Sequence, residues 1–546
     1  MSMFSRRQFL GGMGALGAAA ACPGAWAASA TPSGLSTNAV LRIEAQATGF
    51  SNPLRLPGTS GLFGVLPATD FKEVHVVRSE IEVLPGQRTP ILAYAVESGG
   101  KKFLNPALLA RRGDEMRVKL INHMDQPTVI HWHGLGVDSR NDGNGLNVVA
   151  PGQQMDYAFT VQDRSSMYWY HPHAHGFIPH QAYHGLASLL FVEDEDEATL
   201  RKELALALGE SEIPLVLQDK EFDAQGRLQY APSAAQSFGG WVGSRLMVNL
   251  TERPVLKAGR RIVRFRLLNG SNARSYRLAF LQQGRALGFY LAGTDGGLLA
   301  QPVRIDQTFL SPGQRLDVLV DFREAEAGRP VTLASLPFDP MHQEGGHDMA
   351  AMDHSQHGAA QGAAASATMV MEGDALALMR IDLTASGSPY NRRIPTRLSS
   401  LAKPAEPVDT PRRMQLGHDG KGHWTINGGV FDHATVAMTV QRGARETWLI
   451  ENAERSMPHP MHLHGFSFRV LERLGSPAQI RPLAGARGLL PQDQGMVDTL
   501  QVWPGESVRI VIDFSHPHFG DQDYVFHCHT LEHAEAGMMM RYQVKA

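Results

Sequence analysis

One pattern occurs three times in this chain and limits what the chain can fold into. Each copy begins with a Pro-Gly turn, at residue 151, 312 or 504, and continues with apolar residues at every second position. These apolar residues are Met155, Tyr157, Phe159 and Val161, then Leu316, Val318, Val320 and Phe322, and finally Val508, Ile510, Ile512 and Phe514. Such alternation predicts β-strands with one face in a core and the other toward solvent.

A companion segment precedes each copy. The three segments span residues 112–122, 258–269 and 442–452, and each ends on an asparagine. Repeats this far apart indicate duplicated domains, and short strands between Gly and Pro turns indicate antiparallel β-sandwiches. The sequence therefore predicts an all-β chain of three antiparallel β-sandwich domains, a number that suits 546 residues.

Composition shifts predict where the domains begin and end. We expect domains at residues 38–197, 205–384 and 413–546, with a proline-rich connector at 385–412. Residues 341–367 are rich in Met and His within a Gly, Ala and Gln background. This stretch is predicted to be an insertion between strands of the second domain.

Residues 1–27 have the pattern of an export signal. Arg6 and Arg7 precede a Gly- and Ala-rich apolar run, and Ala25 and Ala27 offer a small-residue cleavage site. This twin-arginine pattern predicts a periplasmic protein. The run is too short to span a membrane, and no later stretch of about 20 apolar residues occurs, so we expect no stable membrane insertion. A net charge of −3 gives no support for nucleic-acid binding.

Four His-x-His pairs fall in the two outer domains. At the corresponding place, the second domain has Ser271-Asn272-Ala273 instead. The pairs can converge only if the outer domains face each other, and eight imidazoles suit a polynuclear copper site. One pair would be weak evidence, but two of the four occupy equivalent positions of duplicated domains. The pairs are His131 and His133, His171 and His173, His462 and His464, and His527 and His529.

Cys528 stands between two of these histidines. Because side chains alternate along a strand, Cys528 points to the face opposite His527 and His529. His533 and Met538 follow closely, and a thiolate with imidazoles and a thioether forms a blue-copper electron-transfer site. The other cysteine, Cys22, leaves with the signal, so no disulfide is expected. The tripeptide His527-Cys528-His529 would join an electron entry site at Cys528 to a second copper site at the two histidines. This arrangement indicates an oxidase.

These motifs resemble the three-domain multicopper oxidases, the laccase-like family, over nearly the whole mature chain. The resemblance implies cupredoxin-like Greek-key sandwiches, four copper ions per chain, and four-electron reduction of dioxygen to water. It also implies the copper ligands. Type 1 copper would take His459, Cys528 and His533 with axial Met538, type 2 copper His131 and His462, and the type 3 pair His133, His171, His173, His464, His527 and His529.

Reduction of dioxygen needs protons, so carboxyl groups near the cluster are candidates for the catalytic acid. Asp142, eleven residues after His131, matches the acidic residue that the family has near type 2 copper. The family often has Glu directly after the residue matching His533, whereas this chain has Ala534 and then Glu535. Either Glu535 or a chain of waters would deliver protons in place of the missing Glu.

The chain resembles most closely the periplasmic cuprous oxidases of copper tolerance. Thioethers favour Cu(I), and Met457 lies two residues before His459. We therefore expect Cu(I) as the reductant, with a small aromatic reductant of a laccase or bilirubin-oxidase-like enzyme as the alternative. A non-enzymatic copper carrier, or a scaffold like the exported cell-division proteins of this fold, is disfavoured by the complete ligand set. We expect a monomer. Candidate ligands of a substrate copper are Met457, Met341, Met349, Met352, Asp353 and His354.

Overall fold

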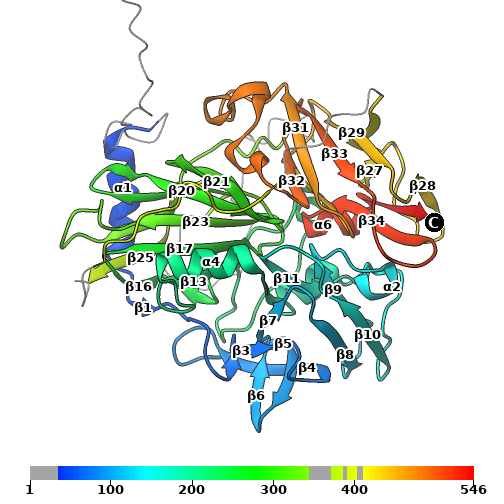
Figure 1. The fold of residues 1–546 in the computed structure, drawn as a ribbon, viewed down its shortest axis with the longest axis horizontal. Coiled ribbons are helices and arrows are strands. Elements are labelled where there is room, and N and C mark those ends of the chain that lie inside the picture. Colours follow the sequence, from blue (N-terminus) through cyan, green and yellow to red (C-terminus); the bar gives the residue numbers. More distant parts are fainter. Residues whose placement is uncertain (1–34, 344–369, 385–389, 402–409) are drawn as a thin grey trace, which may run out of the picture.

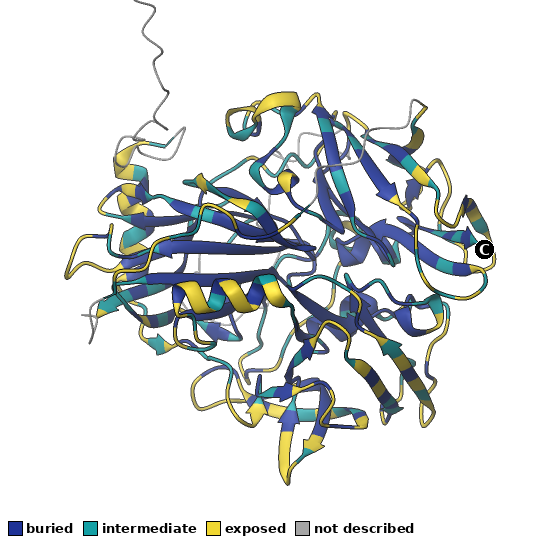
Figure 2. Ribbon diagram, in the orientation of Figure 1, coloured by how far each residue is buried: buried dark blue, intermediate teal, exposed yellow. Residues whose placement is uncertain are grey.

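Three β-sandwiches make up the chain (Figure 1). The computed structural model describes residues 35–343, 370–384, 390–401 and 410–546. Each sandwich consists of two sheets that face each other across a hydrophobic core. Buried residues are concentrated in these cores and where the sandwiches meet (Figure 2).

The first sandwich supplies β9 and β11, the strands that carry its two histidine pairs. One sheet is ordered β10 (Gln154–Thr160), β8 (Glu115–Asn122), β4 (Glu73–Glu82), β5 (Arg88–Ser98), β6 (Lys101–Leu104) and β2 (Gly61–Leu62). The other is ordered β3 (Val65–Pro67), β7 (Ala107–Arg111), β12 (Ser188–Glu193), β11 (Ser166–Pro172) and β9 (Ile130–His133).

The second sandwich is built from two larger sheets. The first is ordered β1 (Asn52–Pro53), β16 (Pro254–Gly259), β25 (Leu376–Thr384), β24 (Val331–Ser335), β18 (Tyr276–Gln282) and β19 (Arg285–Leu287), with β22 (Thr308–Leu310) also paired to β18. The second is ordered β15 (Thr251–Glu252), β14 (Arg245–Val248), β13 (Glu212–Lys220), β17 (Ile262–Asn269), β23 (Arg315–Asp321), β20 (Phe289–Thr294) and β21 (Gly297–Ile305).

The third sandwich carries the remaining candidate ligands on β30 and β34 and just beyond β34. One sheet is ordered β27 (Trp424–Ile426), β26 (Arg412–His418), β29 (Arg445–Asn452), β33 (Ser507–Asp513) and β31 (Phe468–Leu474). The other is ordered β28 (Val436–Gln441), β35 (Met539–Lys545), β34 (Gln522–Cys528), β30 (His459–Leu463) and β32 (Thr499–Val502).

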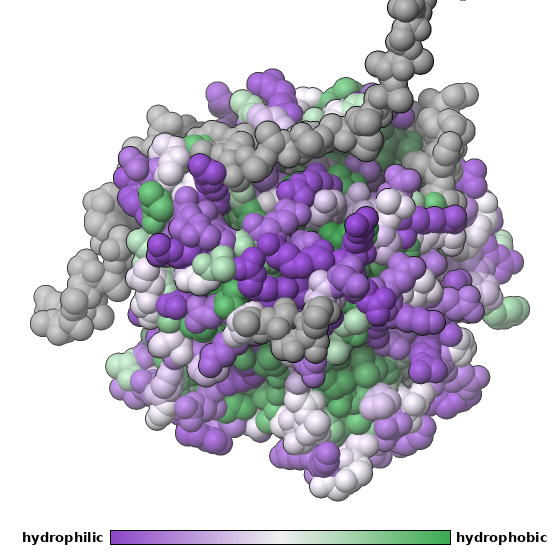
Figure 3. Space-filling model, turned by 60° about the vertical axis from the view of Figure 1, so that its left-hand side comes forward, coloured by the Kyte–Doolittle hydropathy of each residue, from purple (hydrophilic) through white to green (hydrophobic). Residues whose placement is uncertain are grey.

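The helices are short and lie in the connections. They are α1 (Thr37–Ala47), α2 (Ser139–Asp142), α3 (Ile178–Tyr183), α4 (Glu195–Leu204), α5 (Ala234–Gly239) and α6 (Leu531–Glu535), with 3₁₀ turns η3 (Arg481–Leu483), η4 (Ala486–Gly488) and η5 (Pro491–Gln494). No helix in the described ranges is long and apolar enough to cross a membrane. Hydrophilic side chains cover much of the face shown in Figure 3.

The predicted repeat is confirmed as a pair of neighbouring strands in each sandwich. β10 pairs antiparallel with β8, β23 with β17, and β33 with β29. Most other neighbours are also antiparallel, but each sandwich includes parallel pairs such as β4 with β8, β13 with β17, and β26 with β29. These pairs are parallel because the chain enters the opposite sheet between the two strands.

The start of the first domain differs from the prediction. Residue 38 falls in α1, and α1 packs against β25, β18 and β24 of the second sandwich. Its buried face, with Val40 and Ile43, joins a core cluster that contains Leu281 and Leu336. β1 then adds to the edge of the same sheet by pairing with β16. The chain therefore begins on the second sandwich before it enters the first, an arrangement that local sequence patterns do not reveal.

Candidate metal centres

The outer sandwiches meet along the strands that carry the histidine pairs. In Figure 1, β9, β11 and α2 of the first sandwich lie beside β34 and α6 of the third, and α2 contacts β34 while α3 contacts α6. Within each outer sandwich, the two histidine pairs lie on neighbouring strands. His131 is opposite His171, and His462 is opposite His527. The predicted meeting of the outer domains is thus what the structure shows.

Eight histidines converge at this interface, and each is at most 1% exposed. Two close contacts cross from the first to the third sandwich: His131 Nε2 lies 3.4 Å from His462 Nε2, and His173 Nε2 lies 3.3 Å from His527 Nε2. Three sets of rings bring their nitrogens close enough to hold a metal ion together. These sets are His131, His462 and His464; His131, His133 and His171; and His173, His464 and His527.

His529 completes the group of eight. Its ring centroid lies 5.0 Å from that of His133 and 5.3 Å from that of His171. Both of its ring nitrogens are buried without a hydrogen-bond partner among the described residues. A buried imidazole without a hydrogen-bond partner destabilises the fold unless a further group binds it. This property fits a metal ligand.

The outward nitrogens of the rings are held by oxygen atoms. Nδ1 of His131, His462 and His527 donates to the carbonyl oxygens of Asp142, Asp498 and Cys528, at 2.8, 2.9 and 2.9 Å. These contacts fix the tautomer and leave Nε2 directed into the cluster, as in many metal sites. His133 is turned the other way, because its Nε2 meets Asp498 Oδ1 at 3.1 Å while its Nδ1 faces His171 Nε2 at 3.3 Å.

The electrostatics of the cluster favour neutral imidazole, the form that binds metals. Burial, followed by the neighbouring histidines, lowers the pKa of His131 and His464 well below the usual value. Burial likewise lowers the pKa of His171, to about 3. The same direction holds for the pKa of His133, His173, His527 and His529.

Asp142 lies where the sequence predicted an acid. It ends α2, is buried, and places Oδ2 2.8 Å from His464 Nδ1. Its Oδ1 lies 3.6 Å from His131 Nδ1 and has no hydrogen-bond partner among the described residues. Burial, and then the charge of Asp138, raises the pKa of Asp142 well above its usual value.

A second buried acid, Asp498, was not predicted. Its Oδ1 lies 3.1 Å from His133 Nε2 and 3.4 Å from His462 Nδ1, so it touches candidate ligands from both outer sandwiches. Arg315 of the second sandwich donates to both of its oxygens, from Nη1 at 2.8 Å and from Nη2 at 2.5 Å. Although burial raises it, the pKa of Asp498 is held well below its usual value by the Arg315 guanidinium. Asp498 therefore stays an anion beside the cluster.

Gly134 makes room for this ion pair. It follows His133 with a φ of +91°, and a Cβ there would lie 2.6 Å from Arg315 Nη2 and 2.6 Å from Asp498 Oδ2. The sequence signal for Asp498 is faint, since an Asp before a strand is common. Asp498 comes close to His462 only because β32, which follows Asp498, pairs with β30.

A second, smaller centre lies on the other face of β34. Cys528 Sγ lies 3.6 Å from His459 Nδ1 and 3.4 Å from His533 Nδ1, and the two nitrogens are 3.1 Å apart. All three residues are fully buried, and together they form a candidate metal group. Met538 is also fully buried and belongs to the same core cluster as Cys528, and its backbone carbonyl accepts from the Cys528 amide at 3.0 Å.

The thiol needs a cation to ionise. Burial raises the pKa of Cys528 to about 12, so it would remain protonated at neutral pH. A bound metal ion deprotonates a coordinating thiol outright. The donor set of thiolate, two imidazoles and a thioether fits copper.

The other predicted residues are placed differently. Both carboxylate oxygens of Glu535 accept from backbone amides, those of Gly176 at 2.6 Å and Ile178 at 3.2 Å. Met457 is buried in the core cluster of the third sandwich, and Met341 packs beside a cluster that contains Trp503. The remaining candidates, Met349, Met352, Asp353 and His354, lie outside the described residues.

Comparisons with known proteins agree with this geometry. Two family models, both described as multicopper oxidase, match residues 85–197 and 405–546, which lie in the outer sandwiches. The McoA multicopper oxidase of Aquifex aeolicus is 34% identical, with a TM-score of 0.77 over 91% of this chain and 100% of that chain. The chain belongs to the multicopper oxidase family.

Two further relatives of similar identity carry different names. A multicopper oxidase of Staphylococcus epidermidis is 29% identical over 81% of this chain and 82% of the relative. The cell division protein FtsP of Xenorhabdus nematophila is 29% identical over 80% of this chain and 82% of the relative. A multicopper oxidase uses copper to oxidise a reducing substrate with dioxygen, so this chain is an oxidoreductase.

Proposed function

We propose that this multicopper oxidase holds four copper ions and oxidises Cu(I) to Cu(II) in the periplasm, as part of copper tolerance. The balanced reaction is four Cu(I), one dioxygen and four protons giving four Cu(II) and two waters. The observation that carries the oxidase proposal is the adjoining pair of buried ligand clusters, joined by the tripeptide His527-Cys528-His529.

The ligand geometry supports a particular assignment of copper types. Type 1 copper would be held by His459, Cys528 and His533, with Met538 as the axial ligand. The two rings that meet across the sandwiches, His131 and His462, would hold type 2 copper. Type 3 copper would take two sets of three rings: His133, His171 and His529, and His173, His464 and His527.

Copper at these positions would supply one-electron redox chemistry and bind dioxygen. The protein would connect the two clusters, because Cys528 is covalently attached to a ligand of the larger cluster on each side. Asp142 is the candidate proton donor, since it is buried against His464 and keeps one carboxyl oxygen without a partner among the described residues. Glu535 is a weaker candidate because both of its oxygens bind backbone amides.

Cu(I) as the substrate is supported by the two ends of the Met- and His-rich insertion. His342 Nε2 lies 3.3 Å from Glu372 Oε2, so the first residues of the insertion lie beside a residue that follows it. The Gln343 amide donates to the Ser456 carbonyl at 3.0 Å, and Ser456 Oγ lies 3.1 Å from His459 Nε2. The insertion thus starts beside a proposed type 1 ligand, where an electron would enter. Thioethers and imidazoles in that segment would favour Cu(I).

The periplasmic location rests on the twin-arginine pattern of residues 1–27. It is tested by following the length and location of the exported chain after Arg6→Lys and Arg7→Lys are introduced together. Retention of the variant in the cytoplasm is expected. Unchanged export would contradict the proposed pathway.

A phenol oxidase is the second candidate, because an aromatic side chain covers the smaller cluster. The Trp424 ring centroid lies 4.7 Å from those of both His459 and His533, and Phe238 stacks on Trp424 at 4.4 Å. Trp424 is fully buried, so the partly exposed Phe238 would provide the surface on which an aromatic reductant could stack.

Steady-state oxidation of Cu(I) and of a phenol separates these candidates. In one variant a Gly/Ser linker of equal length replaces residues 344–369. In the control, Met155 of the first sandwich is changed to Leu. Cuprous oxidation should lose most of its kcat/KM in the linker variant, with phenol oxidation retained. Equal loss of both activities would remove the case for Cu(I), and no oxygen consumption by the copper-loaded wild type would favour a carrier or scaffold.

A further inference from the structure

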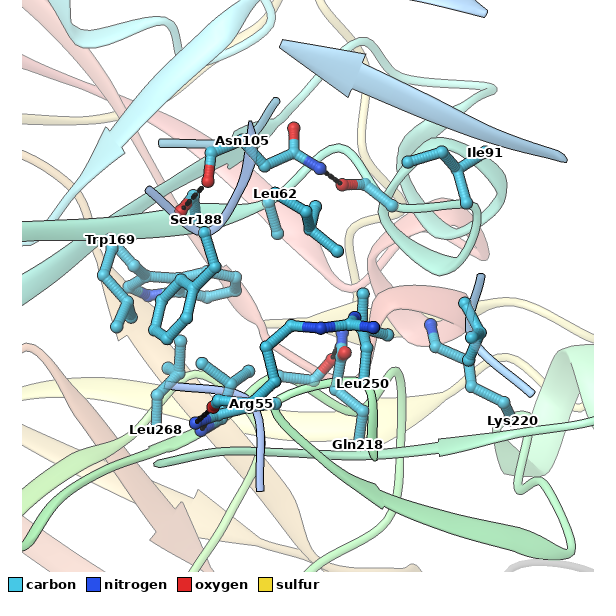
Figure 4. A pocket seen from close by; sticks show the side chains of 18 of the residues that line it. Arg55, Leu62, Ile91, Asn105, Trp169, Ser188, Gln218, Lys220, Leu250 and Leu268 are labelled. Atoms are coloured by element: carbon cyan, nitrogen blue, oxygen red, sulfur yellow. Dashed lines mark hydrogen bonds between the residues drawn. The ribbon is translucent and has the colours of Figure 1, made fainter. Parts of the chain in front are cut away.

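A pocket of about 70 Å³ lies between the first and second sandwiches, and no histidine of the two clusters is among the described residues that line it (Figure 4). Its walls come from both sandwiches and are mostly apolar, with Leu62, Ile91 and Leu189 from the first and Val216 and Leu268 from the second. No acidic residue occurs among the described residues that line it.

Two cationic side chains point into this apolar space, and Figure 4 shows both of them, Arg55 and Lys220. Lys220 is 2% exposed, and its Nζ donates to the Tyr183 carbonyl oxygen at 2.6 Å. The same Nζ lies over the Tyr183 ring, 4.2 Å from its centroid. An ammonium has three donors, so the carbonyl and the ring of Tyr183 leave at least one donor available. The acid next to it, Asp219, binds the Gly243 amide and Arg274 instead.

Arg55 is likewise short of acceptors. Its Nη2 donates to the Glu82 carbonyl oxygen at 2.9 Å, whereas its Nη1 is buried and has no hydrogen-bond partner among the described residues. A buried cationic donor without an acceptor is costly, and such a group calls for a bound ion or water. Two cations with donors to spare, in one apolar pocket that no carboxylate lines, make an anion the fitting occupant.

The size and lining of the pocket narrow the choice of anion. A pocket of about 70 Å³ has less than half the volume of the cavity of about 150 Å³ that accepts benzene, so it suits a small acid better than an aromatic one. The apolar wall would contact the methyl group of a small organic acid, but it offers nothing to a spherical halide. We propose that this pocket binds a small carboxylate of the size of acetate, with the carboxylate at Arg55 and Lys220 and the methyl group against Leu62 and Leu189.

One wall of the pocket also touches the larger histidine cluster. Trp169 lines the pocket, and its ring centroids lie 4.2 Å from that of His171 and 5.1 Å from that of His133. Burial lowers the pKa of Lys220 to about 7, and a carboxylate beside it would favour its charged form. A bound acid would therefore sit directly behind a side chain that packs on the candidate copper ligands.

Isothermal titration of the copper-loaded protein with acetate, in buffer free of chloride and of other carboxylates, tests this proposal. Saturable binding of one acetate is expected. Lys220→Met and Arg55→Gln should each weaken it at least about tenfold, because each removes a charge-assisted hydrogen bond. Lys101→Met and Arg88→Gln, at exposed positions of the same sandwich, should leave it unchanged. Benzoate should not bind, and equimolar chloride should not displace acetate.

Several results would overturn the proposal. They are no saturable heat with acetate, equal affinity in wild type and both pocket variants, or displacement by equimolar chloride, which would indicate a halide site. If Lys220→Met fails to fold, Leu62→Phe keeps both cations, fills the apolar side and should still weaken acetate binding. Because the readout is binding, it is independent of whether Cu(I) is the substrate.

Discussion

The outer and second sandwiches share one structural frame but use it differently. In each, the strand that pairs with the strand after the repeated Pro-Gly turn ends on a buried asparagine, and the Nδ2 of this asparagine donates to two backbone carbonyls. Asn122 bonds the carbonyls of Gln126 and Val149, Asn269 those of Arg274 and Leu310, and Asn452 those of Met457 and Val502. Asparagines at equivalent positions thus hold the loops that follow them in the same way in all three sandwiches.

The segments after these asparagines differ between the sandwiches. In the outer sandwiches the next strands, β9 and β30, carry histidines of the clusters. In the second sandwich, Asn272 occupies this region, and its Nδ2 donates to Glu532 Oε1 at 2.8 Å while its carbonyl accepts from the Leu531 amide at 3.0 Å. It therefore holds α6, the helix that carries His533. Arg315 similarly holds Asp498 against the larger cluster. Among the described residues, the second sandwich provides no histidine to either cluster, but it positions residues that touch or carry the candidate ligands.

The largest effect is expected from removing the thiolate of the third sandwich. Cys528→Ser should abolish the intense blue absorption and reduce oxidase turnover to background, because a hydroxyl does not replace a thiolate at copper. Copper at the larger cluster should remain, since its eight histidines lie on the other face of the strand. Absorption and copper content per chain are the measurements. A blue band that survives in the variant would refute the type 1 assignment.

The sequence predicted the strands and the histidine pairs because both depend on short-range patterns. Alternation identified β10, β23 and β33, and His-x-His spacing put both rings of a pair on one face. Contacts set by the packing of sandwiches were missed. Asp498 gains its role only through pairing of β32 with β30 and through Arg315, which lies 183 residues before it. The position of α1 on the second sandwich depends on tertiary packing in the same way.

A smaller effect is expected at the acid of the first sandwich. Asp142→Asn keeps an acceptor for His464 but removes the acidic proton, so turnover should fall by about 10²–10⁴-fold, the range of general acid catalysis. Reduction of the smaller cluster without dioxygen should be unchanged. Stopped-flow reduction and steady-state oxygen consumption measure the two steps, with the exposed Asp125→Asn as control. Unchanged turnover would remove Asp142 as the proton donor.

Arg315→Met tests whether the second sandwich contributes through Asp498. Without the guanidinium the pKa of Asp498 should rise, because burial alone raises it, and its contacts with His133 and His462 should weaken. Loss of such an outer contact typically costs about 10–100-fold in metal affinity or activity.

Competition of this variant with a copper chelator, monitored by copper content, gives the affinity of the larger cluster. Arg304→Met, which breaks the more exposed Arg304–Glu324 pair of the same sandwich, serves as the matched control. The blue absorption of the smaller cluster should be the same in both variants. Equal copper retention by the Arg315 and Arg304 variants would mean that the second sandwich does not affect the copper affinity of the larger cluster through Asp498.

The smallest effect should come from the shared asparagine frame. Asn269→Ala leaves the carbonyls of Arg274 and Leu310 without this donor, at a cost of about 1–3 kcal/mol for an unsatisfied buried group. Hydrogen–deuterium exchange should rise in residues 270–276 and 308–314, with copper content unchanged. Asn452→Ala removes the same type of bond beside Met457, two residues before His459, so it should also alter the blue absorption. Asn269→Ala could instead disturb the copper sites as much as Asn452→Ala does. That result would contradict the inference that only the loop of the third sandwich supports a copper site directly.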